Sequence, residues 1–432
     1  MNHIKIFHYH LNPGGVTRII ESQVISLLET NPSLKISIIT GDCENTLYFE
    51  NLGANVILNK NLGYLIAPEK DHQNIYDQIK EFLENILNKD DIIHFHNLNL
   101  GKNPLLTYAI YEYIEKGFKV LNHAHDFAED RQANIEVLKL VVEKKFGYKL
   151  NAFLYRNRNN YLYATLNSYD KKRLIDYGIK PDRITLLPNP VRFNENELDK
   201  PKKKIQKLIL NQLNLDPNKK IVTYPVRVIR RKNIGEFILL AVLLKDVANW
   251  VVTLPPQNPV EIIPYESWKK FCSKNKISVT FEAGTKVNFE ELITVSDVCI
   301  TTSYQEGFGM VYMEPWLLKT PVVGRNLEYI TKDLKQSGIE FPMLYNAINV
   351  EFENSIQDFA NLEPEVQMQI IENVLSDINF KKSILRENSF ITNLLNTIDK
   401  KTVNKNISII TREYSLNNYA ERLERIYQKF AG

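Results

Sequence analysis

The amino-acid sequence predicts an α/β protein made of two lobes, each built around a parallel sheet. Short runs rich in β-branched and aromatic residues alternate with amphipathic stretches, which is typical of parallel strands joined by helices. The alternation stops at a segment rich in proline, asparagine and lysine and then begins again. The length of 432 residues leaves room for two such lobes, because an ordinary domain has roughly 100 to 200 residues.

The expected elements follow this alternation in order. In the first lobe, strands are predicted at Ile4–Phe7, Ile36–Thr40, Val56–Leu58, Ile92–Phe95 and Lys119–Asn122, and helices at Thr17–Leu28 and Ile75–Leu87. In the second lobe, strands are predicted at Ile221–Tyr224, Trp250–Leu254, Val279–Phe281, Val298–Thr301 and Pro321–Val323, and helices at Ile234–Leu244 and Met310–Leu318.

Residues 188–217 separate the lobes, and we place the boundary near residue 191. This segment contains proline turns and the lysine-rich run at 200–204. The run could touch a phosphate or an anionic membrane surface, although a solvated linker face is the favoured interpretation. After Tyr345 the chain is predicted to be mainly helical. Ser415 is expected to cap a final helix, whose apolar residues repeat at three- and four-residue steps.

Composition excludes several classes of protein. The 54 Lys and Arg against 51 Asp and Glu give a net charge of only +3, so nucleic acid is not an expected partner. Cys43, Cys272 and Cys299 are too dispersed for a disulfide framework or a thiolate zinc site. The start of the chain lacks the apolar run of a signal peptide, and Phe237–Leu244 is shorter than the roughly 18 residues of a membrane span. We therefore expect a cytoplasmic protein without a transmembrane segment; peripheral membrane contact and the oligomeric state stay open.

The most informative segment runs from Thr301 to Trp316, from a strand end through a glycine loop into a predicted helix. Ligands of open α/β sheets gather beyond the carboxyl ends of strands. Gly307 and Gly309 permit close backbone approach, and the N–H groups that open a helix favour phosphate oxygens. Glu306 in the loop and Glu314, expected in the second helical turn, suit sugar or ribose hydroxyls. The alternative interpretation is that both carboxylates are surface charges.

Two other strand-to-helix loops carry groups suited to an anion. Arg227 and Lys232 follow the first strand of the second lobe and would fit a diphosphate. The intervening Arg230 and Arg231 are expected to be solvated. The Gly14-Gly15 pair follows the first strand of the first lobe and could present backbone N–H groups, although paired glycines usually only form turns.

Histidines are concentrated at two strand ends, in His94-Phe95-His96 and in His123-Ala124-His125-Asp126. Alternation places each histidine pair on one face of its strand. The pairs could be metal ligands with Asp126 as a further donor, polar residues lining a sugar pocket, or buried residues satisfied by hydrogen bonds. A sugar pocket is favoured, because cysteines and a third ligand cluster are lacking.

Glu306 and Glu314, with seven residues and Gly-Phe-Gly between them, resemble the signature of the retaining family 4 glycosyltransferases. These enzymes have the GT-B fold, in which two Rossmann-like lobes face a central cleft. Gly14-Gly15 is similar to the family's N-terminal glycine loop and His125 to its active-site histidine. Arg227 with Lys232 is similar to its diphosphate-binding pair.

The resemblance also divides the chain by role. Residues 1–190, completed by a helix at 415–432 that crosses back, would bind the acceptor, and residues 191–414 would bind the donor. The sequence departs from the family at Asn233 and Pro190, where glycine is usual, and at Gly324-Arg325-Asn326. Arg325 and Glu328 are expected to read hydroxyls or a charge of the sugar.

The implied reaction is transfer of a hexose from a nucleoside diphosphate sugar to a hydroxyl of a small-molecule or glycan acceptor, with retention and without a metal or other cofactor. The implied catalytic residues are Glu306, His125, Arg227 and Lys232. The implied donor-binding residues are Gly14, Gly15, Arg227, Lys232, Gly284, Thr285, Glu306, Gly307, Phe308, Gly309, Met310, Val311 and Glu314. The implied acceptor-binding residues are His96, His123, Asp126 and Arg131. A metal-dependent hydrolase that uses the histidine pairs, or a catalytically silent sugar-nucleotide-binding protein, are the alternatives.

Overall fold

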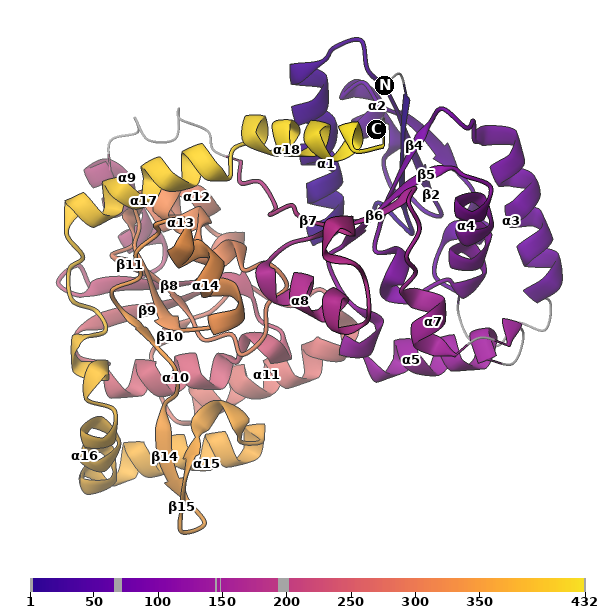
Figure 1. The fold of residues 1–432 in the computed structure, drawn as a ribbon. Coiled ribbons are helices and arrows are strands. Elements are labelled where there is room, and N and C mark those ends of the chain that lie inside the picture. Colours follow the sequence, from indigo (N-terminus) through magenta and orange to yellow (C-terminus); the bar gives the residue numbers. More distant parts are fainter. Residues whose placement is uncertain (1–2, 66–71, 144–145, 148, 193–201, 431–432) are drawn as a thin grey trace. The chain divides into compact units, whose positions relative to one another are not determined.

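A computed structural model describes residues 3–65, 72–143, 146–147, 149–192 and 202–430. The chain divides into two compact units, the first containing residues 1–192 and 414–432 and the second residues 193–413 (Figure 1). Met1 and Asn2 of the expected N-terminal segment, and Lys200 and Pro201 of the lysine-rich run, lie outside the described residues. From Lys202 onward the run forms the start of a helix.

The first unit contains a seven-stranded parallel sheet with the strand order β3-β2-β1-β4-β5-β6-β7. Its strands are β1 (His3–His8), β2 (Lys35–Thr40), β3 (Asn55–Leu58), β4 (Ile92–His96), β5 (Lys119–Ala124), β6 (Tyr161–Thr165) and β7 (Ile184–Leu186). Its helices are α1 (Gly15–Thr30), α2 (Thr46–Asn51), α3 (His72–Ile86), α4 (Pro104–Glu115), α5 (Gln132–Leu138), α7 (Leu150–Leu154), α8 (Ser168–Asp176) and α18 (Leu416–Gln428). The predicted strands are confirmed, whereas β6 and β7 were not predicted.

The inner strands β1, β2, β4, β5 and β6 are buried along almost their whole length, as expected for a parallel sheet with helices on both faces. Alternate residues of one strand belong to different cores: Ile6 packs with α1, and Phe7 packs with α3 and α4. The predicted final helix is confirmed as α18, whose cap Ser415 accepts a hydrogen bond from the N–H of Asn418. Tyr419 and Leu423 of α18 join the core on the α1 side, and Figure 1 shows α18 lying beside α1.

The second unit contains a six-stranded parallel sheet with the order β10-β9-β8-β11-β12-β13. Its strands are β8 (Lys220–Arg227), β9 (Ala248–Leu254), β10 (Val279–Thr280), β11 (Val298–Thr301), β12 (Val322–Arg325) and β13 (Leu344–Tyr345). Its helices are α9 (Lys202–Gln212), α10 (Ile234–Leu243), α11 (Pro259–Lys274), α12 (Phe289–Val295), α13 (Glu314–Leu317), α14 (Glu328–Gln336), α15 (Pro364–Ser376), α16 (Ile378–Glu387) and α17 (Lys400–Glu413). Every residue of α10 is buried, including Glu236, which interrupts its otherwise apolar sequence.

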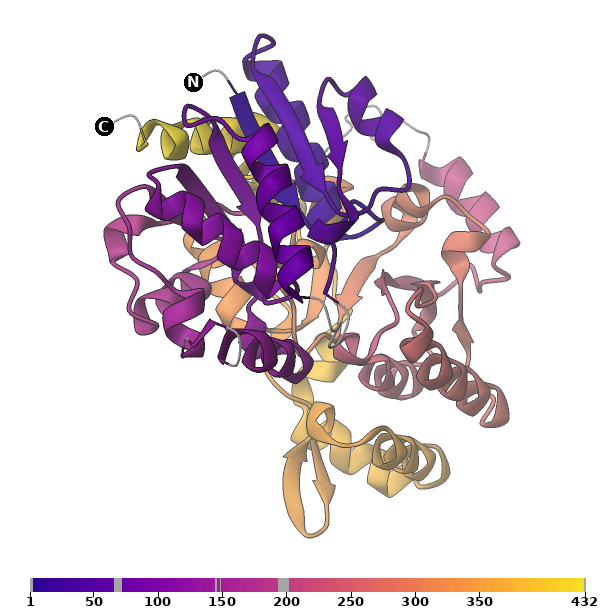
Figure 2. The ribbon, with the colours of Figure 1, turned by 90° about the vertical axis from the view of Figure 1, so that its right-hand side faces the viewer.

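A hairpin interrupts the segment that was expected to be mainly helical. Strands β14 (Asn349–Phe352) and β15 (Ser355–Asp358) pair antiparallel outside the six-stranded sheet, and Figure 2 shows the hairpin projecting from the second unit. Its two-residue turn has positive φ at both Glu353 and Asn354, as the favoured hairpin turns require. Among the described residues, no helix combines the length and the apolar character needed to cross a bilayer.

Candidate active site

The second unit brings Lys232 and Glu306 together at the carboxyl ends of neighbouring strands β8 and β11. Lys232 Nζ donates a hydrogen bond to Glu306 Oε1, and Arg231 Nη1 lies 3.4 Å from Glu306 Oε2. The Lys232 and Glu306 side chains are only 11% and 6% exposed. Burial lowers the pKa of Lys232, and the Glu306 carboxylate opposes that shift. Arg231, which was expected to be solvated, keeps 41% of its side chain exposed and also belongs to this cluster of two cations and one carboxylate.

Hydrogen bonds to the backbone hold Lys232 in place. Tyr224 Oη donates to the Lys232 carbonyl, and Thr302 Oγ1 lies 2.9 Å from the carbonyl oxygens of both Lys232 and Asn233. Asn233 has a φ of 55°, in the left-handed region that glycine favours and asparagine tolerates. The departure from glycine at this position therefore preserves the backbone turn that leads into α10.

The glycine loop after Glu306 is fixed by one contact and one special conformation. The Glu306 N–H donates to Tyr329 Oη at 2.7 Å, and Tyr329 Oη donates back to the Glu306 carbonyl at 3.0 Å. Gly309 has a φ of 80°, and a Cβ there would lie 2.7 Å from Ile330 Cγ2. Only glycine fits this position without a shift of its neighbours.

The prediction of one continuous helix at Met310–Leu318 is wrong. Met310–Tyr312 forms a 3₁₀ turn, Met313 leaves the helical region with φ −124°, and the four-residue α13 begins at Glu314. Pro315 has no N–H to extend a helix that began at Met310. Glu314 therefore opens α13, exposed to solvent, instead of lying in a second helical turn, and Val311 is buried beneath the loop.

The other donor-side residues lie at neighbouring strand ends of the second unit. Arg227 is the exposed last residue of β8. Gly284 lies in the 3₁₀ turn Ala283–Thr285 that follows β10, and a Cβ there would lie 3.1 Å from the Thr253 carbonyl oxygen. Thr285 Oγ1 donates to the Glu282 carbonyl at 2.7 Å. Glycine thus lets this turn pack against the end of β9.

Arg325 is buried inside the second unit, contrary to the expectation that it reads the sugar. Its guanidinium donates to Glu236 and to Asp358, 2.7 Å away, and Tyr345 Oη donates to Glu236 Oε1 at 2.6 Å. Burial raises the pKa of Glu236, whereas Arg325 lowers it. Arg325 therefore neutralises a fully buried carboxylate inside the second unit. Glu328 lies exposed at the start of α14.

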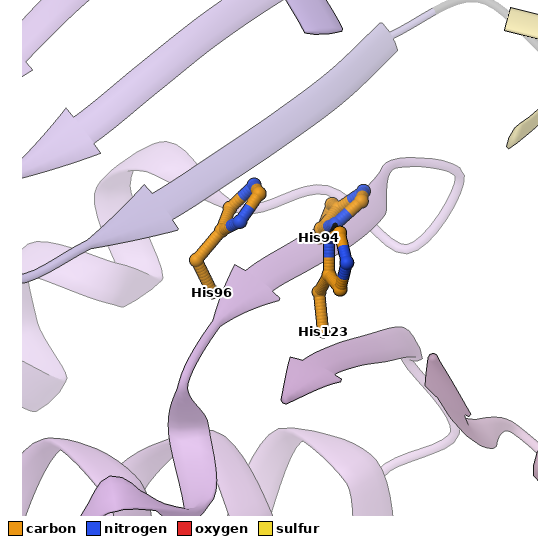
Figure 3. A group of neighbouring side chains, drawn as sticks. All are labelled: His94, His96 and His123. Atoms are coloured by element: carbon orange, nitrogen blue, oxygen red, sulfur yellow. Dashed lines mark hydrogen bonds between the residues drawn. The ribbon is translucent and has the colours of Figure 1, made fainter. Parts of the chain in front are cut away.

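The first unit collects imidazoles at the carboxyl ends of β4 and β5 (Figure 3). The ligand nitrogens of His94, His96 and His123 lie within 4.8 Å of one another, close enough to be candidate ligands of a metal ion. His94 Nε2 is 3.3 Å from His123 Nδ1, and His96 Nδ1 is 2.8 Å from His125 Nε2. Gln23 bridges His94 and His96, at 2.8 Å from each ring. Most of these nitrogens already take part in hydrogen bonds within the cluster.

These imidazoles are neutral near pH 7. Burial, followed by neighbouring imidazoles, lowers the pKa of His94, His96 and His125 well below the usual value. Burial lowers the pKa of His123 and of His8 to about 3. A neutral ring can donate one hydrogen bond and accept another. Because His125 Nε2 pairs with His96, its Nδ1 is the atom suited to a further hydrogen bond.

The remaining first-unit predictions lie on loops around this cluster. Asn97 Oδ1 accepts the backbone N–H groups of His125, at 2.7 Å, and Asp126, at 3.1 Å. Arg131 is exposed at the start of α5. The Gly14-Gly15 pair is exposed before and at the start of α1, where a Cβ on Gly15 would meet no atom within 4 Å. This pair belongs to the first unit, whereas the rest of the predicted donor set belongs to the second.

Sequence reasoning missed several residues of the histidine cluster. Tyr427 Oη of α18 lies 2.7 Å from His94 Nδ1, and His8 Nδ1 lies 3.2 Å from the His96 carbonyl oxygen. A signal for His8 was present, because the alternation in His8-Tyr9-His10 repeats that in His94-Phe95-His96. Gln23 and Tyr427 carried no comparable signal.

Comparison with known proteins shows the family to which the chain belongs. Residues 205–362 match the family described as Glycosyl transferases group 1. Mannosylglucosyl-3-phosphoglycerate synthase of Petrotoga mobilis is 34% identical over 356 residues, which span 78% of this chain and 68% of that protein. The chain belongs to the glycosyl transferases group 1 family. A second relative of this glycosyltransferase, mannosylglucosylglycerate synthase of Petrotoga mobilis, is 22% identical over 357 residues, or 72% of this chain and 79% of that one.

Solved structures agree on the fold of this glycosyltransferase. Anabaena HepE, in complex with UDP and glucose, matches with a TM-score of 0.61 and 16% identity, covering 99% of this chain and 100% of that one. The two units with parallel sheets therefore form the α/β GT-B fold that the glutamate signature predicted.

Proposed function

We propose that this glycosyltransferase moves a hexosyl group from a nucleoside diphosphate sugar to a hydroxyl of an anionic glucoside, with retention of configuration and without a metal ion. The observation that carries the proposal is the buried Lys232–Glu306 pair at the ends of β8 and β11, joined by Arg231. It combines a cation for a phosphate with a carboxylate for a sugar.

The donor half of the reaction follows from these charges. When the bond between the anomeric carbon and the diphosphate oxygen breaks, negative charge builds on the departing diphosphate. Lys232 and Arg227 would stabilise that charge, and fixed donors that act where charge develops are usually the largest catalytic contribution. The burial of Lys232 strengthens its interaction, because little water screens it. Glu306 would accept hydrogen bonds from the hexose, and the contact with Lys232 would hold the Glu306 carboxylate in place.

The same cations remove the need for a metal ion or a side-chain base. The acceptor oxygen would bond to the anomeric carbon on the face from which the diphosphate leaves, and its proton would pass to a diphosphate oxygen. His125, neutral at pH 7, would orient hydroxyl groups. Glu314 would bind the ribose of the donor, and Gly284 and Thr285 would bind its nucleobase. The Gly14-Gly15 pair stays a predicted contact for an anion.

The relatives support a more specific substrate. Both are named for products that carry a mannosyl and a glucosyl unit on glycerate, one of them phosphorylated. We therefore propose mannose as the transferred hexose. The acceptor would be a glucosylglycerate, with or without a phosphate, and is anionic in either form.

The test is incubation of the full chain with nucleoside diphosphate sugars, including GDP-mannose, and with each glucosylglycerate. We expect release of nucleoside diphosphate that depends on the acceptor, a product heavier by one hexose in mass spectrometry, and an NMR coupling that shows retention. Tight nucleotide binding without release would favour the silent binding protein. Activity that disappears on chelation, with zinc in the purified protein, would favour metal chemistry at the histidine cluster.

A further inference from the structure

Four loops of the first unit bring two cations and two polar rings to one edge of its sheet. Lys102 lies between β4 and α4, and Arg131 lies on the loop after β5. Tyr64 follows β3 and His10 follows β1. All four follow the carboxyl ends of parallel strands, where ligands of open α/β sheets bind. Lys102, Tyr64 and His10 were not among the predicted site residues, whereas Arg131 was.

Direct contacts join these loops. Lys102 Nζ lies 5.1 Å from the centroid of the Tyr64 ring. Tyr64 Oη is 3.2 Å from His10 Nε2, and the two rings meet edge to face with centroids 5.2 Å apart. Leu65 N–H donates to the Lys102 carbonyl at 2.8 Å, which ties the Tyr64 loop to the Lys102 loop. The lysine side chain is therefore held over an aromatic surface.

The segment that carries Arg131 is joined to the loop that carries Lys102, because Asn134 Nδ2 donates to the Leu100 carbonyl at 3.1 Å. Burial, and then the positive charge of Arg131, lower the pKa of Lys102. The Tyr64 pKa is raised by burial, and Arg131 and Asp126 act on it in opposite directions. Within the described part of the chain, neither Lys102 nor Arg131 forms an ion pair with a carboxylate. Two neighbouring cations repel each other, and a bound anion would relieve that repulsion.

Lys102 and Arg131 lie on the loops after β4 and β5, and these two loops meet at His125, the residue expected to hold the acceptor. Asn97 Oδ1 accepts the N–H of His125 and that of Asp126, whose charge reaches Tyr64. We propose that Lys102, Arg131 and Tyr64 form a subsite for an anionic group of the acceptor, a phosphate or a carboxylate. The inference rests on the proposed function, because it assigns residues to the charged end of the acceptor whose hydroxyl is glycosylated.

The test uses Lys102→Gln and Arg131→Gln in the full chain, with Lys116→Gln as the matched control. Lys116 Nζ also lies over a tyrosine ring, 5.0 Å from the centroid of Tyr113, but it precedes β5 at the opposite edge of the sheet. Two readouts are used: the acceptor KM, and direct calorimetric binding of 3-phosphoglycerate, glycerate or inorganic phosphate, which requires no transfer.

We expect each site variant to weaken 3-phosphoglycerate binding, and to raise the KM of the anionic acceptor, by roughly 10- to 100-fold, since hydrogen bonds to charged groups are worth this much. The donor KM should stay within about twofold, and Lys116→Gln should match the wild type. Binding of inorganic phosphate but not glycerate would identify the phosphate as the bound group, and the reverse would identify the carboxylate.

The outcomes separate this inference from the proposed function. Normal transfer with an unchanged acceptor KM in both site variants would overturn the subsite and leave the function standing. Absence of transfer, together with 3-phosphoglycerate binding that both variants lose, would support the subsite and count against the function. No binding of any probe by the wild type, with equal acceptor KM in all variants, would also overturn the subsite.

Discussion

The candidate site of the second unit is charged, whereas that of the first is built around neutral rings. Lys232 and Arg231 share the single carboxylate of Glu306 in the second unit, which leaves this cluster with one net positive charge. All eight histidines lie between residues 3 and 125, so residues 193–413 contain none. A buried charge needs an opposite charge, but a buried imidazole needs only hydrogen-bond partners. The charged cluster of the second unit is therefore suited to a charged leaving group, and the histidine cluster of the first unit to hydroxyl groups.

The largest expected effect tests the charged site. Lys232→Ala should lower kcat/KM for the donor by roughly 100- to 1000-fold, because a cation aimed at developing charge is lost. Glu306→Ala should also lower transfer strongly. Lys405→Ala is the control, since Lys405 pairs with Glu340 on a half-exposed surface. Steady-state kinetics and circular dichroism separate catalysis from folding. A kcat/KM of Lys232→Ala within tenfold of the wild-type value would contradict the assignment of the charged site to the leaving group.

The second-largest expected effect is a loss of stability at low pH that is confined to the first unit. The imidazoles of His8, His94, His96, His123 and His125 are buried, and their pKa values are lowered from the 6.5 of an unfolded chain, to about 3 for His8 and His123. The unfolded state therefore binds protons first as the pH falls below about 6.5. The free energy of unfolding should drop by about 1.4 kcal/mol per pH unit for each such imidazole, until the folded pKa is reached.

One group in the first unit opposes this trend. Burial raises the pKa of Asp170 to about 6, so this carboxyl group stabilises the unit as the pH falls through that value. A single carboxyl group is outweighed by five imidazoles. Calorimetry and hydrogen exchange at pH 7, 6 and 5 should show the first unit unfolding before the second. Equal losses in both units would contradict the neutral-ring assignment, and His94→Gln should flatten the dependence.

Replacing one glycine in each unit should give a smaller difference, in stability. Gly309→Ala places a Cβ against Ile330 at a φ of 80° and should destabilise the second unit by about 1 to 3 kcal/mol. Gly15→Ala meets no atom within 4 Å and should change the stability of the first unit by less than about 0.5 kcal/mol. Chemical denaturation with probes in each unit measures both. A Gly309→Ala protein as stable as the wild type would show that the loop can relax.

Two tyrosines of α18 give the smallest expected effect. Tyr427→Phe removes a hydroxyl that lies 2.7 Å from His94 Nδ1 and should destabilise the first unit by about 1 to 2 kcal/mol. Tyr419→Phe is the matched control, because its buried hydroxyl has no hydrogen-bond partner among the described residues. Thermal unfolding would show the difference. Equal shifts for both variants would mean that the bond to the histidine cluster contributes nothing.

The sequence predicted best where the chemistry lies within a few consecutive residues. Glu306 and Gly309 occupy one loop, and Lys232 follows a strand whose apolar run is clear. The prediction of a helix at Met310–Leu318 failed because it relied on the spacing of apolar residues, which takes no account of the backbone N–H that Pro315 lacks. Arg325 was misread because its partner Glu236 lies 89 positions away.

Long-range partners explain the rest. Gln23 and Tyr427 are 404 positions apart and meet only after folding, so no local pattern links them. The β14–β15 hairpin depends on two consecutive positive φ values at Glu353-Asn354, of which only asparagine gives a hint in sequence. Local patterns therefore predicted the strands, whereas the side-chain networks needed the three-dimensional arrangement.

The return of α18 to the first unit has a consequence for synthesis of the protein. The α1 surface that Tyr419 and Leu423 cover is made early in translation, but its cover leaves the ribosome only after the whole second unit. Throughout that interval the nascent chain carries an apolar strip around Ile20 and Val24. Such a strip attracts chaperones or other nascent chains, so the protein should gain from a chaperone that shields its amino-terminal half until elongation is complete.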